Sequence, residues 1–321
     1  MFPQDQYELI DFGHGRRLER FGPLILDRPC PSAAGIPMRK PEIWQTADVR
    51  FLDTGKTDAK NDPQRGEWQS RTDAARRIFE KTAQNSSQNS RSWTISGNRM
   101  SLELRGTPFG HVGIFPEQME NWRKIHTLCQ RFAEPPKILN LFAYTGGSTL
   151  AAAKAGAEVT HLDSAKNILA WGKQNAAISG RMDHPVRWIA EDAWKFVTRE
   201  KKRGNPYQGI ILDPPSYGHG VQGEVWRLSK HLPGLLADCF SLLKPNEGAF
   251  LLLTAHTPGY TLPKLAEMVL HAAQKNWGAD AGEMIKGEMI KIEKKPMVLV
   301  SRFGAELRLG ESVLFCYNNR S

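Results

Sequence analysis

Three aspartates stand at the ends of apolar segments, a position from which they could bind a nucleoside. Asp163 and Asp213 directly follow such segments, and Asp192 follows another after a single glutamate, Glu191. The carboxyl ends of parallel strands lie along one edge of a sheet, where α/β proteins bind their ligands. There Asp163 could accept hydrogen bonds from the ribose hydroxyls and Asp192 from the exocyclic amine of adenine. In that arrangement the amide of Ala193 would donate to a ring nitrogen of the adenine. Alternatively, Asp192 could cap a helix that begins at Ala193.

A glycine turn precedes the first of these aspartates. Residues 138–142 form an apolar run of strand type, which stops at Thr145-Gly146-Gly147 and is followed by an alanine-rich helical pattern. Glycines in such a turn let a ligand approach the backbone amides. The turn lacks the G-x-G-x-x-G spacing that binds the pyrophosphate of a nicotinamide cofactor. S-adenosylmethionine joins adenosine to an amino acid without any phosphate, and we therefore predict it as the cofactor.

The third aspartate begins the segment Asp213-Pro-Pro-Ser-Tyr217. Two consecutive prolines restrict the backbone to an extended course just beyond the strand. This course fixes Asp213 where a methyl acceptor would meet the sulfonium, and positioning supplies most of what a protein contributes to methyl transfer. We predict that Asp213 and Pro214 belong to the catalytic site and that Tyr217 stacks on a flipped-out base. A rigid turn with a buried tyrosine is the alternative.

The elements that must position these residues begin near residue 120. From there, apolar strand segments alternate with helical patterns, which indicates a doubly wound α/β fold. Residues 1–110 hold short strand-like pieces and a long polar loop at 53–73, and we predict a small β-rich domain, a candidate substrate-binding appendage, ahead of a catalytic domain at 111–321. The expected strands are 138–142, 158–162, 186–190, 209–212, 249–253, 284–293 and 297–315, and the expected helices are 121–132, 148–155, 165–179, 193–202, 224–243 and 262–276.

Composition restricts the compartment and the partners. The chain carries 43 basic and 34 acidic residues, and a net charge of +9 suits a polyanionic partner such as RNA. No stretch reads as a signal peptide or is apolar enough to span a bilayer, so we expect a cytoplasmic protein that does not contact membranes. The four cysteines are scattered without C-x-x-C spacing, which predicts buried free thiols. We expect no metal site, and a homo-oligomer stays an open alternative.

The motifs resemble those of class I S-adenosylmethionine-dependent methyltransferases. The resemblance rests on residues 140–147, Asp163-Ser164, Glu191-Asp192 and residues 213–217, and it covers about residues 93–260. More closely, these motifs are similar to the branch of bacterial 23S ribosomal RNA methyltransferases that make 5-methylcytosine or 7-methylguanine, and residues 110–118 resemble the loop ahead of that branch's catalytic domain. The resemblance implies a Rossmann-like seven-stranded sheet and an RNA substrate, ribosomal RNA in particular. It implies cofactor contacts from Gln118, Phe142, Tyr144, Thr145, Gly146, Gly147, Asp163, Ser164, Glu191, Asp192, Ala193 and Asp213.

One departure from that branch concerns the mechanism. Cytosine-5 methylation needs a cysteine thiolate that adds to the pyrimidine ring, and members with this activity carry a Ser-Cys-Ser-type turn after the fifth strand. Here the turn reads Thr254-Ala255-His256, and Cys239 falls in a helical pattern typical of a core. We therefore predict direct attack by a nitrogen lone pair, aided by Asp213 or His256. A methyltransferase that acts on a small molecule or a protein, and a non-catalytic protein that only binds the cofactor, are the alternatives.

Overall fold

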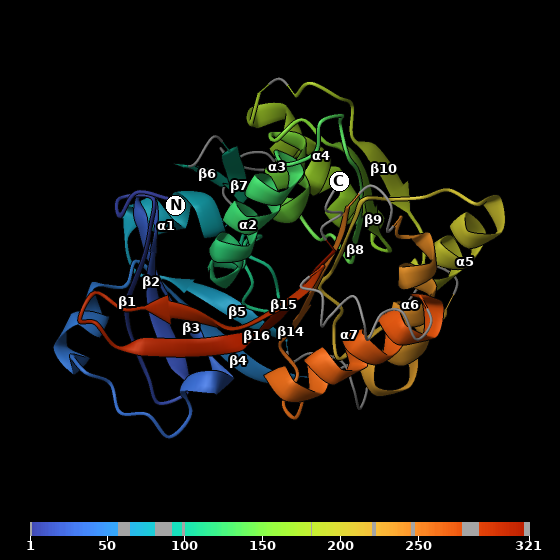
Figure 1. The fold of residues 1–321 in the computed structure, drawn as a ribbon. Helices are drawn as coiled ribbons and strands as arrows, with labels where there is room; N and C mark the ends of the chain where they lie inside the picture. The colour runs from blue at the N-terminus through green and yellow to red at the C-terminus, as the bar shows by residue number, and fades with distance from the viewer. Residues whose placement is uncertain are drawn as a thin grey trace. The chain divides into compact units, whose positions relative to one another are not determined.

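The computed structural model describes residues 2–56, 65–80, 92–97, 100–180, 182–219, 223–244, 248–277 and 289–317. The chain forms two compact units, which Figure 1 shows as a ribbon. The first unit is Met1–Met119 with Val298–Leu309, and the second is Glu120–Met297 with Gly310–Ser321. No helix among the described residues is long and apolar enough to cross a membrane.

A five-stranded sheet forms the centre of the first unit. Its strands follow one another in chain order, and every neighbouring pair is antiparallel except β3 and β4. A separate hairpin and the short helix α1 complete the unit, and Thr72 caps α1 by accepting the amide of Ala75. The elements are β1 Tyr7–Gly13, β2 Arg16–Phe21, β3 Leu24–Pro29, β4 Val49–Lys56, β5 Arg65–Ser70, α1 Asp73–Phe79, β6 Trp93–Gly97 and β7 Met100–Leu104.

The prediction of a polar loop at 53–73 was wrong over residues 53–56, which belong to β4, and over residues 65–70, which form β5. Trp68 of this strand pairs with Phe51 of β4, and their ring centroids lie 5.1 Å apart. The Trp68 indole also donates a hydrogen bond to the carbonyl of Thr107 at 2.8 Å. Cross-strand aromatic pairs stabilise a sheet, so a single tryptophan anchors a segment that is otherwise polar.

A seven-stranded sheet runs through the second unit in the order β10-β9-β8-β11-β14-β16-β15, which confirms the predicted α/β fold class with its β-rich N-terminal sheet. The strands from β10 to β14 are parallel, and β16 is antiparallel to β14. The direction of strand succession reverses at β8, which places the ligand-binding switch point beside that strand. The strands are β8 Lys137–Leu141, β9 Glu158–Asp163, β10 Arg187–Ala190, β11 Gly209–Leu212, β14 Ala249–Ala255, β15 Ile290–Val300 and β16 Glu306–Tyr317.

Helices cover both faces of this sheet. His161 of β9 contacts the helices on one face and Leu162 belongs to the core on the other, because successive side chains of a strand point to opposite sides. The helices α3 and α4 pack on the first face, and α5, α6 and α7 pack on the second. The helices of the second unit are α2 Met119–Cys129, which begins on the last residue of the first unit, α3 Gly147–Ala153, α4 Lys166–Ile178, α5 Ala193–Arg203, α6 Leu228–Leu242 and α7 Leu262–Trp277.

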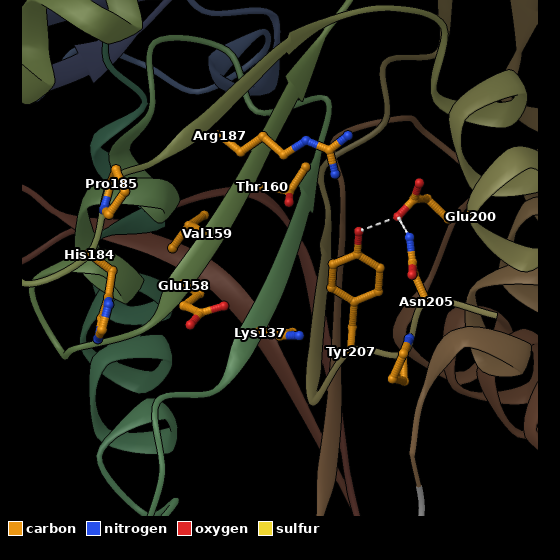
Figure 2. Close-up of a pocket in the computed structure, with 11 residues that line it drawn as sticks. Lys137, Glu158, Val159, Thr160, His184, Pro185, Arg187, Glu200, Asn205 and Tyr207 are labelled. Atoms are coloured by element: carbon orange, nitrogen blue, oxygen red, sulfur yellow. Dashed lines mark hydrogen bonds between the residues drawn. The ribbon is translucent and has the colours of Figure 1, made fainter. Parts of the chain in front are cut away.

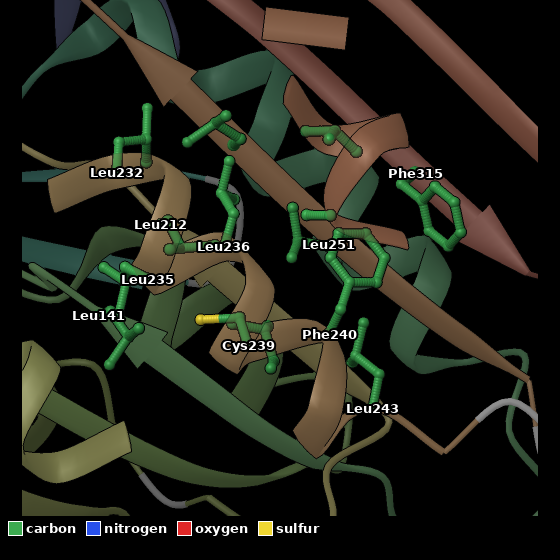
Figure 3. Packing of buried hydrophobic residues seen from close by; sticks show 14 of the residues in the cluster. Leu141, Leu212, Leu232, Leu235, Leu236, Cys239, Phe240, Leu243, Leu251 and Phe315 are labelled. Carbon is green, nitrogen blue, oxygen red and sulfur yellow. The ribbon is translucent and has the colours of Figure 1, made fainter. Parts of the chain in front are cut away.

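The largest core lies between α6 and the sheet. Apolar residues recur along α6 at helical spacing, and they pack against side chains from the central strands. Figure 3 shows Leu235, Cys239 and Phe240 of α6 close to Leu212 of β11 and Leu251 of β14. Cys239 is fully buried in this cluster, as its helical pattern predicts.

The prediction of one helix over 224–243 was wrong at its start. Val225–Arg227 form the strand β13, which pairs with β12 (Tyr217–His219), and α6 begins only at Leu228. Trp226 stabilises this hairpin because its indole donates to the carbonyl of Pro215 at 2.7 Å. A β-branched residue followed by a tryptophan also favours an extended backbone.

Candidate functional site

Parallel pairing places the predicted residues in one row at the carboxyl edge of the large sheet. Leu141 pairs with Leu162 and with Leu212, and Leu212 pairs with Leu253. On the far side of β9, Ala190 pairs with Asp163. The residues that follow are therefore neighbours from strand to strand, namely Glu191, Asp163, Phe142, Asp213 and Thr254.

The turn after β8, residues 142–147, is the one predicted to contact the cofactor, and it is called the cofactor turn for that prediction. Its backbone is left-handed at Phe142 (φ 55°), Tyr144 (φ 50°) and Gly146 (φ 93°). Phenylalanine and tyrosine rarely adopt this conformation, and such strain concentrates at ligand sites, where the surrounding structure enforces it. Thr145 is buried, and its carbonyl accepts a hydrogen bond from Asn175 Nδ2 of α4 at 2.9 Å.

The two glycines of the turn are required for different structural reasons. Gly146 needs its left-handed backbone, since the nearest atom to a Cβ there would be His161 Cε1 at 3.7 Å, an ordinary contact. At Gly147 a Cβ would lie 2.4 Å from Cζ2 of Trp122 in α2, so packing against α2 requires that glycine. From the sequence we explained both glycines by the approach of a ligand. The packing of Trp122 against Gly147 could not be predicted from the sequence.

Asp163 connects the cofactor turn to the next loop. Its Oδ2 accepts the amide of Tyr144 at 3.0 Å and its Oδ1 accepts the amide of Ala165 at 2.9 Å, while Ser164 lies half-buried between them. Burial raises the pKa of the Asp163 carboxyl, and the two amides act in the opposite direction. Each carboxylate oxygen retains a lone pair for a further donor.

The acidic pair after β10 has structural partners of its own. Glu191 forms a two-pronged ion pair with Arg199 of α5, with distances of 2.5 and 2.6 Å. Asp192 caps α5, since its Oδ1 accepts the amide of Lys195 at 2.9 Å, and the following Ala193 is buried. The capping alternative is therefore realised at Asp192.

Asp213 and His256 come together at the end of β11 and β14. His256 Nε2 lies 3.4 Å from Asp213 Oδ1, and the Thr254 hydroxyl donates to the same oxygen at 2.5 Å. Both side chains are about one-third exposed. A Cβ at Gly310 of β16 would lie 3.1 Å from His256 Nδ1 and 2.8 Å from the carbonyl of Ala255, so that glycine leaves room for the histidine.

The proline segment after Asp213 is held at both ends. Pro214 is buried, and the Ser216 hydroxyl lies 2.6 Å from that of Thr257 in the loop after β14. Tyr217 is half-buried in β12, so a part of its surface faces solvent. Phe142 of the cofactor turn packs on Trp226, with ring centroids 4.9 Å apart. Sequence reasoning missed Trp226 because it assigned that residue to a helix.

Comparison with known proteins identifies the family. A family model described as S-adenosylmethionine-dependent methyltransferase matches residues 73–255, more than half of the chain. The chain belongs to this family. A solved S-adenosylmethionine-dependent methyltransferase from Agrobacterium tumefaciens is 32% identical, with a TM-score of 0.78 over 98% of this chain and 91% of that one. S-adenosylmethionine is therefore the cofactor, and the protein is a methyltransferase enzyme.

Further relatives carry more specific names. Ribosomal RNA large subunit methyltransferase I of Aeromonas hydrophila is 27% identical to this methyltransferase over 187 residues, which is 58% of this chain and 44% of the relative. The match thus spans less than half the length of that curated relative. A solved methyltransferase complexed with SAH shares the fold at 15% identity, with a TM-score of 0.64 over 97% of this chain and 76% of that one.

Gln118 belongs to the first unit of the methyltransferase. It is buried in a short 3-10 helix, Pro116–Gln118, just before α2 begins. The other predicted cofactor residues all belong to the second unit. A contact from Gln118 to the cofactor stays a prediction. Across the described ranges, no group of three or more His, Cys, Asp or Glu side chains is arranged to hold a metal ion.

A cavity of about 370 Å³ lies at the opposite, amino edge of the same sheet. Figure 2 shows Lys137 and Glu158, the first residues of β8 and β9, beside Tyr207 and Asn205. The polar groups of its wall bind one another: Glu200 accepts hydrogen bonds from Tyr207 Oη at 3.0 Å and from Asn205 Nδ2 at 2.9 Å. None of the predicted site residues lines this cavity, so the cofactor assignment does not depend on it.

Several buried polar residues beside the cofactor turn were missed by sequence reasoning. In the sequence, each of them is a polar side chain at an apolar position of a strand or helix pattern. A single sequence does not show whether such a residue belongs to a functional site or is an ordinary polar group of the core. They are Asn140, Thr149, His161 and Asn175.

Proposed function

We propose that this methyltransferase transfers the methyl group of S-adenosylmethionine to a nitrogen of a base in ribosomal RNA, by direct attack. The observation that carries the proposal is the Asp213–His256 pair at the carboxyl edge, where no cysteine directly follows any of the parallel strands. The cofactor supplies an electrophilic methyl group when bound. The residues of the chain then have to hold the cofactor, orient the base and accept a proton.

The residues of the row fit an adenosine cofactor. Asp163 has lone pairs for the ribose hydroxyls, which matches the usual role of an acidic residue at the end of the second strand. Asp192 and the amide of Ala193 are the proposed partners of the adenine edge, and the left-handed cofactor turn is the proposed partner of the amino acid part. Glu191 is bound by Arg199, and cofactor contacts from Ser164 and Glu191 stay predictions.

The thiols do not support a covalent mechanism. All four cysteines are free and buried, at Cys30, Cys129, Cys239 and Cys316, and none of them is among the residues that directly follow β8, β9, β10, β11 or β14. Burial raises the pKa of Cys129 to about 12 and of Cys316 to about 11, and it also raises the pKa of Cys239. A neutral thiol is a poor nucleophile, so a cytosine-5 mechanism lacks its thiolate.

Asp213 and His256 suit attack by nitrogen. A carboxylate oxygen of Asp213 can accept a hydrogen bond from an N–H of the base and so turn the nitrogen lone pair toward the methyl group. His256, 3.4 Å away, can take up the proton that the nitrogen loses. The Thr254 hydroxyl and the buried Pro214 hold Asp213 in place. Tyr217 is the proposed stacking partner of the base.

The RNA substrate is proposed from two observations. The relatives with the more specific names act on large-subunit ribosomal RNA by those names, and the net charge of +9 favours a polyanion. The first unit would then contribute to substrate binding. A cytoplasmic location and a homo-oligomer stay predictions.

Transfer of a radiolabelled methyl group tests the proposal. Purified enzyme is incubated with labelled S-adenosylmethionine and with either ribosomal RNA from a strain that lacks the enzyme, a protein extract or a small-molecule extract. We expect label in the RNA, and in a base that carries an N-methyl group after digestion to nucleosides. Label confined to protein or small molecules would contradict the substrate class, label in 5-methylcytosine would contradict the mechanism, and no label with S-adenosylhomocysteine binding intact would favour a non-catalytic protein.

A further inference from the structure

His161 lies in the interior directly beneath the cofactor turn. It is in β9 two residues before Asp163, and its side chain is fully buried. Its ring stacks against Trp188 of β10, with centroids 4.4 Å apart. A Cβ at Gly172 of α4 would lie 2.9 Å from Trp188 and 3.4 Å from His161 Cε1, so the glycine lets α4 approach these two rings.

Hydrogen bonds join His161 to the elements on both sides of the turn. Asn140 Nδ2 of β8 donates to Thr149 Oγ1 of α3 at 2.9 Å. The Thr149 hydroxyl lies 2.9 Å from His161 Nδ1. The strand that enters the turn, the helix that leaves it and the next strand are thus connected through three buried side chains.

The imidazole also lies next to the backbone of the turn. A Cβ at Gly146 would lie 3.7 Å from His161 Cε1 and 3.8 Å from Nδ1. Tyr144 and Gly146 both have left-handed backbones at this place. A left-handed tyrosine costs about 1 kcal/mol or more and persists only where the surroundings enforce it.

We propose that His161 is a positioning residue for the cofactor turn, which it holds in the left-handed conformation that binds S-adenosylmethionine. It does not touch the reacting atoms. The inference rests on the proposed role of the turn in cofactor binding and adds the group that sets its conformation. Without the Thr149–His161 contact, the strained turn relaxes and binds the cofactor less tightly.

Two variants and a control test this assignment. His161→Phe keeps a ring but removes the hydrogen bond, and Thr149→Val removes the same bond from the other side at similar volume. Cys239→Ala is the matched control, because it removes a buried side chain from the core on the opposite face of the sheet. Calorimetry with S-adenosylhomocysteine gives the affinity, and hydrogen–deuterium exchange of the free protein gives the order of residues 142–150.

The expected results separate positioning from general stability. Both variants should bind S-adenosylhomocysteine about tenfold more weakly, raise the KM for S-adenosylmethionine with kcat changed by less than about threefold, and speed exchange in residues 142–150. Cys239→Ala should leave all three unchanged. Wild-type affinity and wild-type exchange in both variants would overturn the inference, as would an equal loss in Cys239→Ala. If the wild type bound no S-adenosylhomocysteine, the cofactor assignment would fail, and exchange of the turn would still decide whether His161 orders it.

Discussion

Asp213 is the residue on which the proposed chemistry depends most. We expect Asp213→Asn and His256→Gln each to lower kcat for methyl transfer about 100-fold or more, because each removes a proton acceptor beside the nucleophile. The affinity of His256→Gln for S-adenosylhomocysteine should change by less than about threefold, since His256 is not among the predicted cofactor contacts. Asp213 is among them, so the affinity of Asp213→Asn should also fall, but by less than its kcat. Single-turnover methylation of ribosomal RNA and calorimetry measure the two effects.

An exposed histidine provides the control for that pair. His271 lies on the solvent side of α7, and His271→Gln should methylate at the wild-type rate. If Asp213→Asn and His256→Gln also kept the wild-type rate, the pair would have no part in the reaction.

Asp163 should act on binding rather than on rate. Asp163→Ala removes two acceptors for the ribose hydroxyls and frees the amides of Tyr144 and Ala165. Hydrogen bonds to a charged group contribute about 1.5–3 kcal/mol each, so the affinity for S-adenosylhomocysteine should fall at least 100-fold. Glu158→Ala, an exposed change at the other end of the same strand, is the calorimetric control and should bind normally. Normal binding by Asp163→Ala would place the cofactor elsewhere.

His161 gives the pH dependence of stability a specific source. Burial lowers the pKa of His161 to about 3, while the carbonyl of Tyr144 opposes the shift. The unfolded chain therefore takes up a proton near pH 6.5 that the folded chain refuses, so the stability due to neutral His161 is present above pH 6.5 and is lost as the pH falls. The free energy of unfolding of the wild type should fall relative to that of His161→Phe by about 2–3 kcal/mol between pH 6.5 and 4.5. Urea titrations at several pH values measure it, and parallel curves for the two proteins would show that His161 is not the source.

At the scale of elements, the contact between α2 and α3 depends on the absence of a side chain at Gly147. Gly147→Ala should destabilise the protein by about 1–3 kcal/mol, because its Cβ would clash with the Trp122 ring. The double variant Gly147→Ala with Trp122→Leu should lose less free energy of unfolding than the two single variants lose in sum, because the smaller leucine relieves the clash. Thermal unfolding of the three variants is the measurement, and simple additivity would mean that the two residues are not in contact.

The elements that position the site could largely be predicted, since each parallel strand reads as an apolar run and each following helix has its own period. The row of Asp163, Asp192 and Asp213 follows from strand ends alone. The hairpin that carries Trp226 could not be predicted, because its stability comes from the bond to Pro215 across the turn. The pairing of His256 with Asp213 needed the register of β14 on β11, which no local pattern contains.

At the scale of the whole molecule, one relation between distant segments was beyond sequence reasoning. The segment Val298–Leu309, which comprises the end of β15, the following turn and the start of β16, belongs to the first unit. There the Arg302 amide donates to the carbonyl of Leu9 at 2.8 Å, and its guanidinium forms an ion pair with Glu8 at 2.5 Å. The prediction of one strand over 297–315 was wrong at residues 301–305, which separate β15 from β16. A local strand pattern also cannot name its partner, because the contact joins residues almost 300 positions apart. The first unit is therefore built from residues 1–119 together with a short segment almost 200 positions further along the chain.

Mass spectrometry of ribosomal RNA nucleosides tests most directly whether this enzyme N-methylates a ribosomal RNA base. The set of methylated nucleosides is compared between a strain that lacks the enzyme, the same strain with the wild-type protein and the same strain with Asp213→Asn. We predict that one N-methylated base is lost in the deletion, returns with the wild type and stays absent with Asp213→Asn. An unchanged set of methylated nucleosides in the deletion strain, or the loss of 5-methylcytosine instead, would contradict the account.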